Sequence, residues 1–165
     1  MKKSILIFIF SLAFICTASA QELPPLKNIK LNKKAHFKTA EPLVLKAITY
    51  LFNTPIDKKN KQRTEAGQFL INWMNGTPDY VFYLEEKETD FFNTDADFTL
   101  MYMAGLTKFT LANPALKDKT ELAIGAMQLT LPYLYQQENK KRWSATLWQL
   151  NDANQKGKLK EFLYK

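Results

Sequence analysis

The chain has 165 residues, which suits one globular domain, and a single cysteine, so burial of apolar side chains rather than an internal disulfide must stabilise it. The chain has one thiol, Cys16, and one imidazole, His36. Catalysis that depends on cysteine or histidine, and zinc binding, therefore lack almost all the side chains that they need. The formal charge of +7 comes mainly from lysines spread along the sequence, with arginine only at Arg63 and Arg142, and it therefore indicates a solvated basic surface rather than a nucleic-acid face.

The N-terminus carries the pattern of a secretion signal. Two lysines form a positive start, residues 5–16 are apolar, and residues 18–20, Ala-Ser-Ala, match the small-x-small site of a signal peptidase. The apolar segment is shorter than the roughly 17 residues that a retained membrane anchor needs. Ile15 before Cys16 disfavours a lipoprotein, because acylation requires a small residue there. We expect cleavage after Ala20 and a periplasmic or secreted product.

Cleavage at that position would leave 145 residues with a formal charge of +5 and no cysteine. The product would begin with residues 21–38, which are polar, rich in lysine and contain a Pro-Pro pair, and this composition predicts an extended leader. A first helix is predicted over residues 41–53 and a second over about 57–75, because apolar residues recur on one face at helical spacing. The lysines that open the second helix oppose its dipole, which moves its expected start toward Gln62.

The sequence after the second helix is ambiguous. Thr-Pro-Asp at residues 77–79 is typical of a capped helix start and predicts a short helical turn over residues 80–86. The letters YVFYL at residues 80–84 are equally typical of a β-strand. No second strand is evident, and an isolated strand is unstable, so we expect a short helix or an extended connector here.

A third long helix should occupy the centre of the fold. Residues 94–97 resemble a capping box, and the following residues 98–111 are apolar almost all round, which indicates a helix surrounded by others. Thr120 or Asp118 can cap the next helix, and Pro132 should bend it.

Shorter apolar segments at residues 143–150 and 159–163 complete the chain. Helical periodicity at this density, with only five glycines, predicts an all-α single-domain bundle of about five to six helices over residues 39–165.

Carboxylates are the main candidates for catalytic chemistry. The only histidine falls in the expected leader, and the glycines stand singly, so no phosphate-binding loop is present in the sequence and we expect no cofactor or metal. Acidic residues cluster around the connector at Glu85, Glu86, Glu88, Asp90, Asp95 and Asp97. A pair drawn from Glu85, Glu86 or Asp97 supports the alternative of a cell-wall glycan-active enzyme. Helix N-terminal acids and solvated charges explain the same cluster without catalysis, and we expect no catalytic residue.

Aromatic residues are concentrated in NWMNGTPDYVFYLEEKETD, residues 72–90. Trp73, Tyr80, Phe82 and Tyr83 can form a structural corner between two helices, which accounts for every residue in the stretch. The same four residues can instead form a recognition surface, because Trp and Tyr are favoured binding anchors. We expect the corner, and these four residues are the candidate binding surface.

The run AGQFLINWMNGTPDYVFYLEE, together with the secretion signal, resembles small uncharacterised exported all-helical proteins of Gram-negative bacteria, chiefly over residues 63–86. The resemblance implies an exported helical fold and no catalytic residue, since no activity is assigned to that pattern. The sequence therefore predicts an interaction module without catalysis. Its partner would be an unknown protein, peptide or glycan, with no nucleic acid and no stable membrane span.

Overall fold

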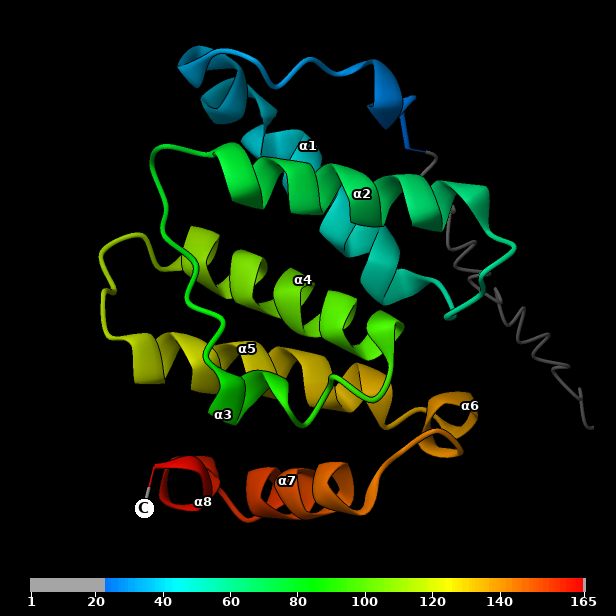
Figure 1. The fold of residues 1–165 in the computed structure, drawn as a ribbon, viewed down its shortest axis with the longest axis vertical. Helices are drawn as coiled ribbons and strands as arrows, with labels where there is room; N and C mark the ends of the chain where they lie inside the picture. The colour runs from blue at the N-terminus through cyan, green and yellow to red at the C-terminus, as the bar shows by residue number, and fades with distance from the viewer. Residues whose placement is uncertain (1–22, 165) are drawn as a thin grey trace, which may run out of the picture.

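Helices supply all the regular secondary structure in the computed structural model, which describes residues 23–164 (Figure 1). The expected cleavage site after Ala20 lies outside the described residues. In chain order the elements are η1 (Leu26–Asn28), α1 (Lys34–Asn53), α2 (Lys61–Gly76), α3 (Glu86–Thr89), α4 (Ala96–Ala112), α5 (Lys119–Leu134), α6 (Gln137–Lys140), α7 (Ala145–Gln155) and α8 (Leu159–Leu163). The predicted all-α fold class is confirmed.

The helices form successive tiers, with α1 and α2 on one side, α4 and α5 in the middle, and α7 and α8 on the other side (Figure 1). α4 contacts α1, α2 and α5, which confirms the prediction that the most apolar helix is central. Its crossing with α5 is close because Gly105 has no side chain: a Cβ there would lie 2.8 Å from the main-chain oxygen of Ala126.

Side-chain caps mark the starts of α2, α4 and α5. Asn60 accepts a hydrogen bond from the main-chain N–H of Arg63, which starts α2 one residue before the expected Gln62. Asp95, rather than Thr94 of the predicted capping box, caps α4 by accepting from Asp97 N–H. Of the two candidates for α5, Asp118 is the cap.

The N-terminal segment differs from the expected leader. α1 begins at Lys34, because Phe37 and Ala40 already face the core and extend its apolar stripe toward the N-terminus. Before it, Leu26 is buried, and the main-chain N–H of Lys27 donates to Glu65 on α2 over 2.7 Å. Residues 23–31 therefore lie packed along α2.

Arg63, which the sequence placed among the solvated charges, is buried. Its Nη1 donates to the main-chain oxygens of Leu51 and Thr54 over 2.7 and 3.0 Å, so the guanidinium satisfies carbonyls that the end of α1 leaves without partners. The hydroxyl of Tyr133 on α5 donates to the same Thr54 oxygen. Together these contacts join α1, α2 and α5 at one corner. The positive charge of Arg63 therefore stabilises the fold.

Candidate binding surfaces

Trp73 is a core residue. Its side chain is fully buried, and its Nε1–H donates to the main-chain oxygen of Phe37 over 2.8 Å, which joins α2 to the start of α1. A buried indole with its only donor satisfied contributes to packing. Trp73 is therefore not available to a partner in this conformation.

Tyr80 and Phe82 cover one side of Trp73. Their ring centroids lie 5.8 and 6.1 Å from the indole, and the two rings stack on each other at 6.4 Å. Both side chains are half-buried against the core. These three aromatics form the structural corner that the sequence favoured, at the point where the chain leaves α2.

Tyr83 points away from that corner and is 42% exposed. Its neighbours Val81 and Leu84 are 65% and 44% exposed, so three large apolar side chains of one short segment face solvent. Sequence reasoning missed Val81 and Leu84. In YVFYL, inward and outward side chains alternate every two residues. Because Tyr80 and Phe82 point inward, this alternation indicates that Val81 is exposed.

The main chain of residues 81–84 is extended and unpaired. The segment is part of the connection over residues 77–85, which joins α2 to α3 without regular structure (Figure 1). Within the part of the chain that the structure describes, its N–H and C=O groups make no hydrogen bond to protein atoms. It therefore combines an apolar surface with free main-chain donors and acceptors, as an exposed sheet edge does.

Lysines surround the end of this segment. The Lys119 ammonium lies 4.2 Å from the ring centre of Tyr83 and 3.4 Å from the carboxylate of Glu85. Lys87 also contacts Glu85, at 2.9 Å. A hydrogen bond from Lys87, and a smaller contribution from that of Lys119, hold the pKa of the Glu85 carboxyl below its usual value. A general acid needs the opposite shift, so Glu85 acts in this arrangement as an ion-pair partner.

Of the other acidic residues in the cluster, Asp95, Asp97 and Glu88 also have structural partners, whereas Glu86 is exposed. Asp95 and Asp97 both contact the guanidinium of Arg142, with 3.1 Å between Asp97 Oδ2 and Arg142 Nη2. Glu88 is buried and accepts a hydrogen bond from the Tyr164 hydroxyl over 2.5 Å. The glycan-active alternative rested on carboxylates of this cluster, and it stays a prediction.

Residues 23–164 contain neither a cluster of metal ligands nor a membrane-spanning helix. No group of three or more His, Cys, Asp or Glu side chains in this part of the chain is placed to hold a metal ion. Among the same residues, no helix combines the length and the apolar character needed to cross a bilayer. His36 lies in the first turn of α1, with its Nδ1 buried and without a hydrogen-bond partner.

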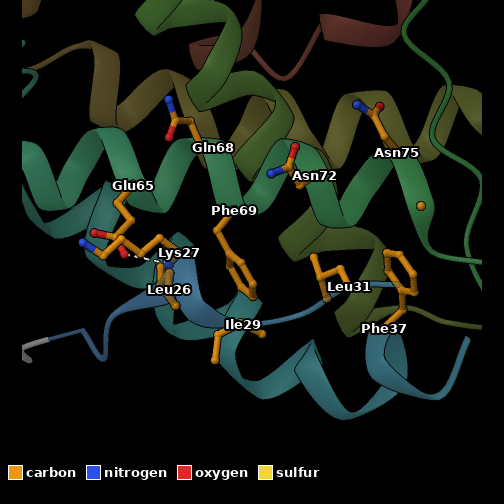
Figure 2. Close-up of a pocket in the computed structure, with 11 residues that line it drawn as sticks. Leu26, Lys27, Ile29, Leu31, Phe37, Glu65, Gln68, Phe69, Asn72 and Asn75 are labelled. Atoms are coloured by element: carbon orange, nitrogen blue, oxygen red, sulfur yellow. Dashed lines mark hydrogen bonds between the residues drawn. The ribbon is translucent and has the colours of Figure 1, made fainter. Parts of the chain in front are cut away.

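A pocket of about 590 Å³ lies between α2 and the N-terminal segment (Figure 2). Its apolar surface comes from both segments and from α1: Leu26, Ile29, Leu31, Phe37 and Phe69. Its polar lining comes from Lys27 on the N-terminal segment and from four residues of α2: Glu65, Gln68, Asn72 and Asn75. This pocket is not evident from the sequence, because three carboxamides on a helix are typical of a solvated face, and only the tertiary fold places the N-terminal segment beside them.

No protein-family model, curated protein or solved structure matches the chain. The resemblance to small exported helical proteins therefore stays a prediction.

Proposed function

We propose that the protein is an exported interaction module that binds a partner protein through residues 81–84. The observation that carries this proposal is the exposure of Val81, Tyr83 and Leu84 on an extended main chain that makes no hydrogen bond within residues 23–164. Exposed apolar patches on a soluble protein mark interaction sites. Free extended main chain adds a directional means of recognition.

The mode of binding that fits this segment is strand addition. A strand of the partner would lie beside residues 81–84 and exchange main-chain hydrogen bonds with them. Val81 and Tyr83 would contact the partner, while Tyr80 and Phe82 stay anchored on Trp73. The β-type composition of YVFYL suits this role, because a strand supplied by another chain removes the instability of an isolated one.

An exported location is supported by the pattern at the N-terminus, with its positive start, apolar segment and Ala-Ser-Ala cleavage site. The absence of cysteine from the expected mature chain is compatible with an oxidising compartment, where a free thiol would be exposed to oxidation. The proposal therefore places the partner in the periplasm or outside the cell.

Site-specific photocrosslinking tests the proposal. A photoreactive amino acid at Val81 should capture one partner in living cells, and the same amino acid at the exposed Gln128 on α5 should not. The captured protein is then purified and titrated against the chain. The double variant Val81→Ser and Tyr83→Ser should weaken this complex at least tenfold while far-UV circular dichroism stays unchanged. Tyr80 is not substituted, because its loss would also expose Trp73.

Two outcomes would contradict the proposal. One is identical crosslinking from Val81 and Gln128, which would mark the contact as nonspecific. The other is an affinity that the double variant leaves unaltered, which would show that the partner binds elsewhere.

A further inference from the structure

The exposed segment 81–84 is held between two anchors. The first is the ring of Phe82, which rests on Trp73. After Phe82, residues 83–87 are exposed or half-buried, and the next buried side chain is that of Glu88 on α3. The main chain of the segment makes no hydrogen bond within the part of the chain that the structure describes. Its position therefore depends on these two anchors.

Tyr164 holds the second anchor. Its hydroxyl donates to the Glu88 carboxylate over 2.5 Å, and no other group among residues 23–164 donates to that carboxylate. A hydrogen bond to a charged acceptor is stronger than a neutral one, and a buried carboxylate without a donor is costly. Beyond α3, Phe92 is buried against Tyr102 and fixes the other end of this helix. α3 has only four residues, too few for a stable isolated helix, so its position depends on these contacts.

The contacts of α8 bring Tyr164 to α3. Both helices lie near the start of α5 (Figure 1). Lys160 on α8 pairs with Glu121 on α5 over 2.8 Å, and the ring of Phe162 lies 5.9 Å from that of Phe91, just after α3. The ammonium of Lys87 on α3 lies 4.5 Å from the centre of the Tyr164 ring. α8 therefore packs directly against the element that follows the exposed segment.

α8 is also an element that can leave its place. It has five residues, and Leu159 is the one that is buried. It is joined to α7 through Gly157, whose φ of 67° suits glycine and which has no atom within 4 Å of an added Cβ. Short elements with few buried apolar side chains open at a low cost in free energy. Release of α8 at this glycine would leave the central pair α4 and α5 folded.

A second, weaker connection runs over the surface. Lys87 contacts Glu85 at 2.9 Å, Glu85 contacts Lys119 at 3.4 Å, and the Lys119 ammonium lies 4.2 Å from the centre of the Tyr83 ring. These charged side chains are 36% to 52% exposed, and exposed ion pairs contribute little to stability. The buried hydrogen bond between Tyr164 and Glu88 is therefore the main connection from α8 to the segment.

We propose that docking of α8 regulates the segment 81–84 and that Tyr164 is the residue that positions it. With α8 docked, Tyr164 holds Glu88, and the segment stays extended and exposed. With α8 released, Glu88 loses its donor, α3 unfolds, and the segment loses its fixed course. The inference rests on the proposed function, because the segment is the partner's site. The coupling is reciprocal, so a bound partner favours the docked state of α8.

Amide exchange and ¹⁵N relaxation of the free chain test the positioning role without a partner. Tyr164→Phe keeps the ring and removes the hydroxyl. The amides of Thr89 and Asp90, which donate within α3, should exchange about tenfold faster in this variant, and the heteronuclear NOE of residues 83–87 should fall. Exchange in α4 should not change. The matched control is Tyr135→Phe, which removes an exposed hydroxyl from the end of α5 and should alter neither measurement.

A second substitution separates the hydrogen bond from packing. Glu88→Met places an apolar side chain of similar length at the position of the carboxylate. Removal of both partners of a buried hydrogen bond is nearly neutral, whereas removal of the donor alone is costly. The double variant Tyr164→Phe with Glu88→Met should therefore exchange more slowly at Thr89 than Tyr164→Phe alone. A purely packing role for Tyr164 predicts no such rescue.

The partner captured from Val81 tests the coupling. Tyr164→Phe should weaken that complex about fivefold or more, the lower end of typical coupling between sites, and Tyr135→Phe should leave the affinity unchanged. In the complex with the parent chain, the amides of α8 should exchange more slowly than in the free chain, although α8 lies outside the binding segment.

Parent-like exchange and relaxation of α3 and residues 83–87 in Tyr164→Phe would overturn the proposal. An affinity that Tyr164→Phe leaves unchanged would overturn it as well, even if α3 exchanges faster. Failure of the proposed function is distinguishable from both, because it appears as nonspecific capture from Val81, while exchange in the free chain still decides whether Tyr164 positions the segment.

Discussion

Arg63 shows how one residue can be misjudged from sequence. It follows a lysine-rich stretch at an expected helix end, and this position is typical of a solvated charge. In the structure its guanidinium donates to Leu51 and Thr54 at the end of α1. Carbonyls at a helix C-terminus carry partial negative charge and attract a cation. This role depends on a tertiary contact between two helix ends, which local sequence does not encode.

Arg63→Ala should lower the free energy of unfolding by about 3 kcal/mol, because it leaves the Leu51 carbonyl unpaired, removes one of the two donors to the Thr54 oxygen, and opens a cavity beside Tyr133. Lys61→Ala, in the exposed first turn of the same helix, should change it by less than about 0.5 kcal/mol. Urea denaturation of both variants measures the difference. Equal effects would mean that the guanidinium does not stabilise this corner.

Tyr102 poses the opposite case, a buried polar group without a partner. Its hydroxyl makes no hydrogen bond within the described residues, and burial, followed by the nearby charge of Glu88, raises the pKa of this phenol above 10.0. An unsatisfied buried hydroxyl costs free energy. Tyr102→Phe should therefore be neutral at pH 7 or should stabilise the protein by up to about 1 kcal/mol. Thermal denaturation would contradict this if the variant were clearly less stable.

The same phenol should make stability depend on alkaline pH. A raised pKa in the folded state means that its full contribution is present below the unfolded value, near 10, and is lost as pH rises above it toward the folded pKa. The Tyr102→Phe variant should lose less stability than the parent chain between pH 9 and pH 11. Urea midpoints at the two pH values give the comparison, and an identical loss in both proteins would exclude Tyr102 as a source.

At the scale of elements, the crossing of α4 and α5 depends on a glycine. Alanine favours a helix over glycine by about 1 kcal/mol. At Gly105, however, the added Cβ would lie 2.8 Å from the main-chain oxygen of Ala126, which cannot move without shifting α5. Overpacking of this kind costs about 1 to 3 kcal/mol and should outweigh the propensity.

Gly105→Ala is therefore expected to lower the free energy of unfolding by about 1 to 2 kcal/mol. Gly67→Ala is the matched control, since its close neighbour is Leu100 Cδ2, the end of a flexible side chain. The control should cost less or even stabilise. Guanidinium denaturation distinguishes the two, and a Gly105→Ala variant as stable as the Gly67→Ala variant would show that the two helices can separate freely.

Periodicity predicted the long helices because each buries a stripe of apolar side chains, and that stripe is visible in sequence. It did not predict the start of α1, since Phe37 and Ala40 follow a polar lysine-rich segment. Nor could it settle YVFYL, whose propensity favours a strand. The structure leaves those residues extended but unpaired, because the described residues offer no strand beside them.

The candidate site was predictable only in part. Trp73 lies on the apolar stripe of α2, so its burial followed from spacing, and Tyr80 and Phe82 follow it around the corner. The exposure of Val81 depends on which side of the segment packs against the helices. Tertiary packing determines that side, so the local sequence does not predict it.

At the scale of the whole molecule, a stable helical core positions two features that the core does not use. One is the segment 81–84, with apolar side chains and free main chain. The other is the pocket beside α2, with its three carboxamides.

Amide hydrogen exchange of the purified chain, alone and with the partner identified by crosslinking from Val81, is the most direct measurement. In the free chain the amides of residues 81–84 should exchange rapidly, since they have no hydrogen-bond acceptor, while those of α4 exchange slowly. In the complex, residues 81–84 should become protected and α4 should not change. Slow exchange of residues 81–84 in the free chain, or rapid exchange that persists in the complex, would contradict binding by strand addition.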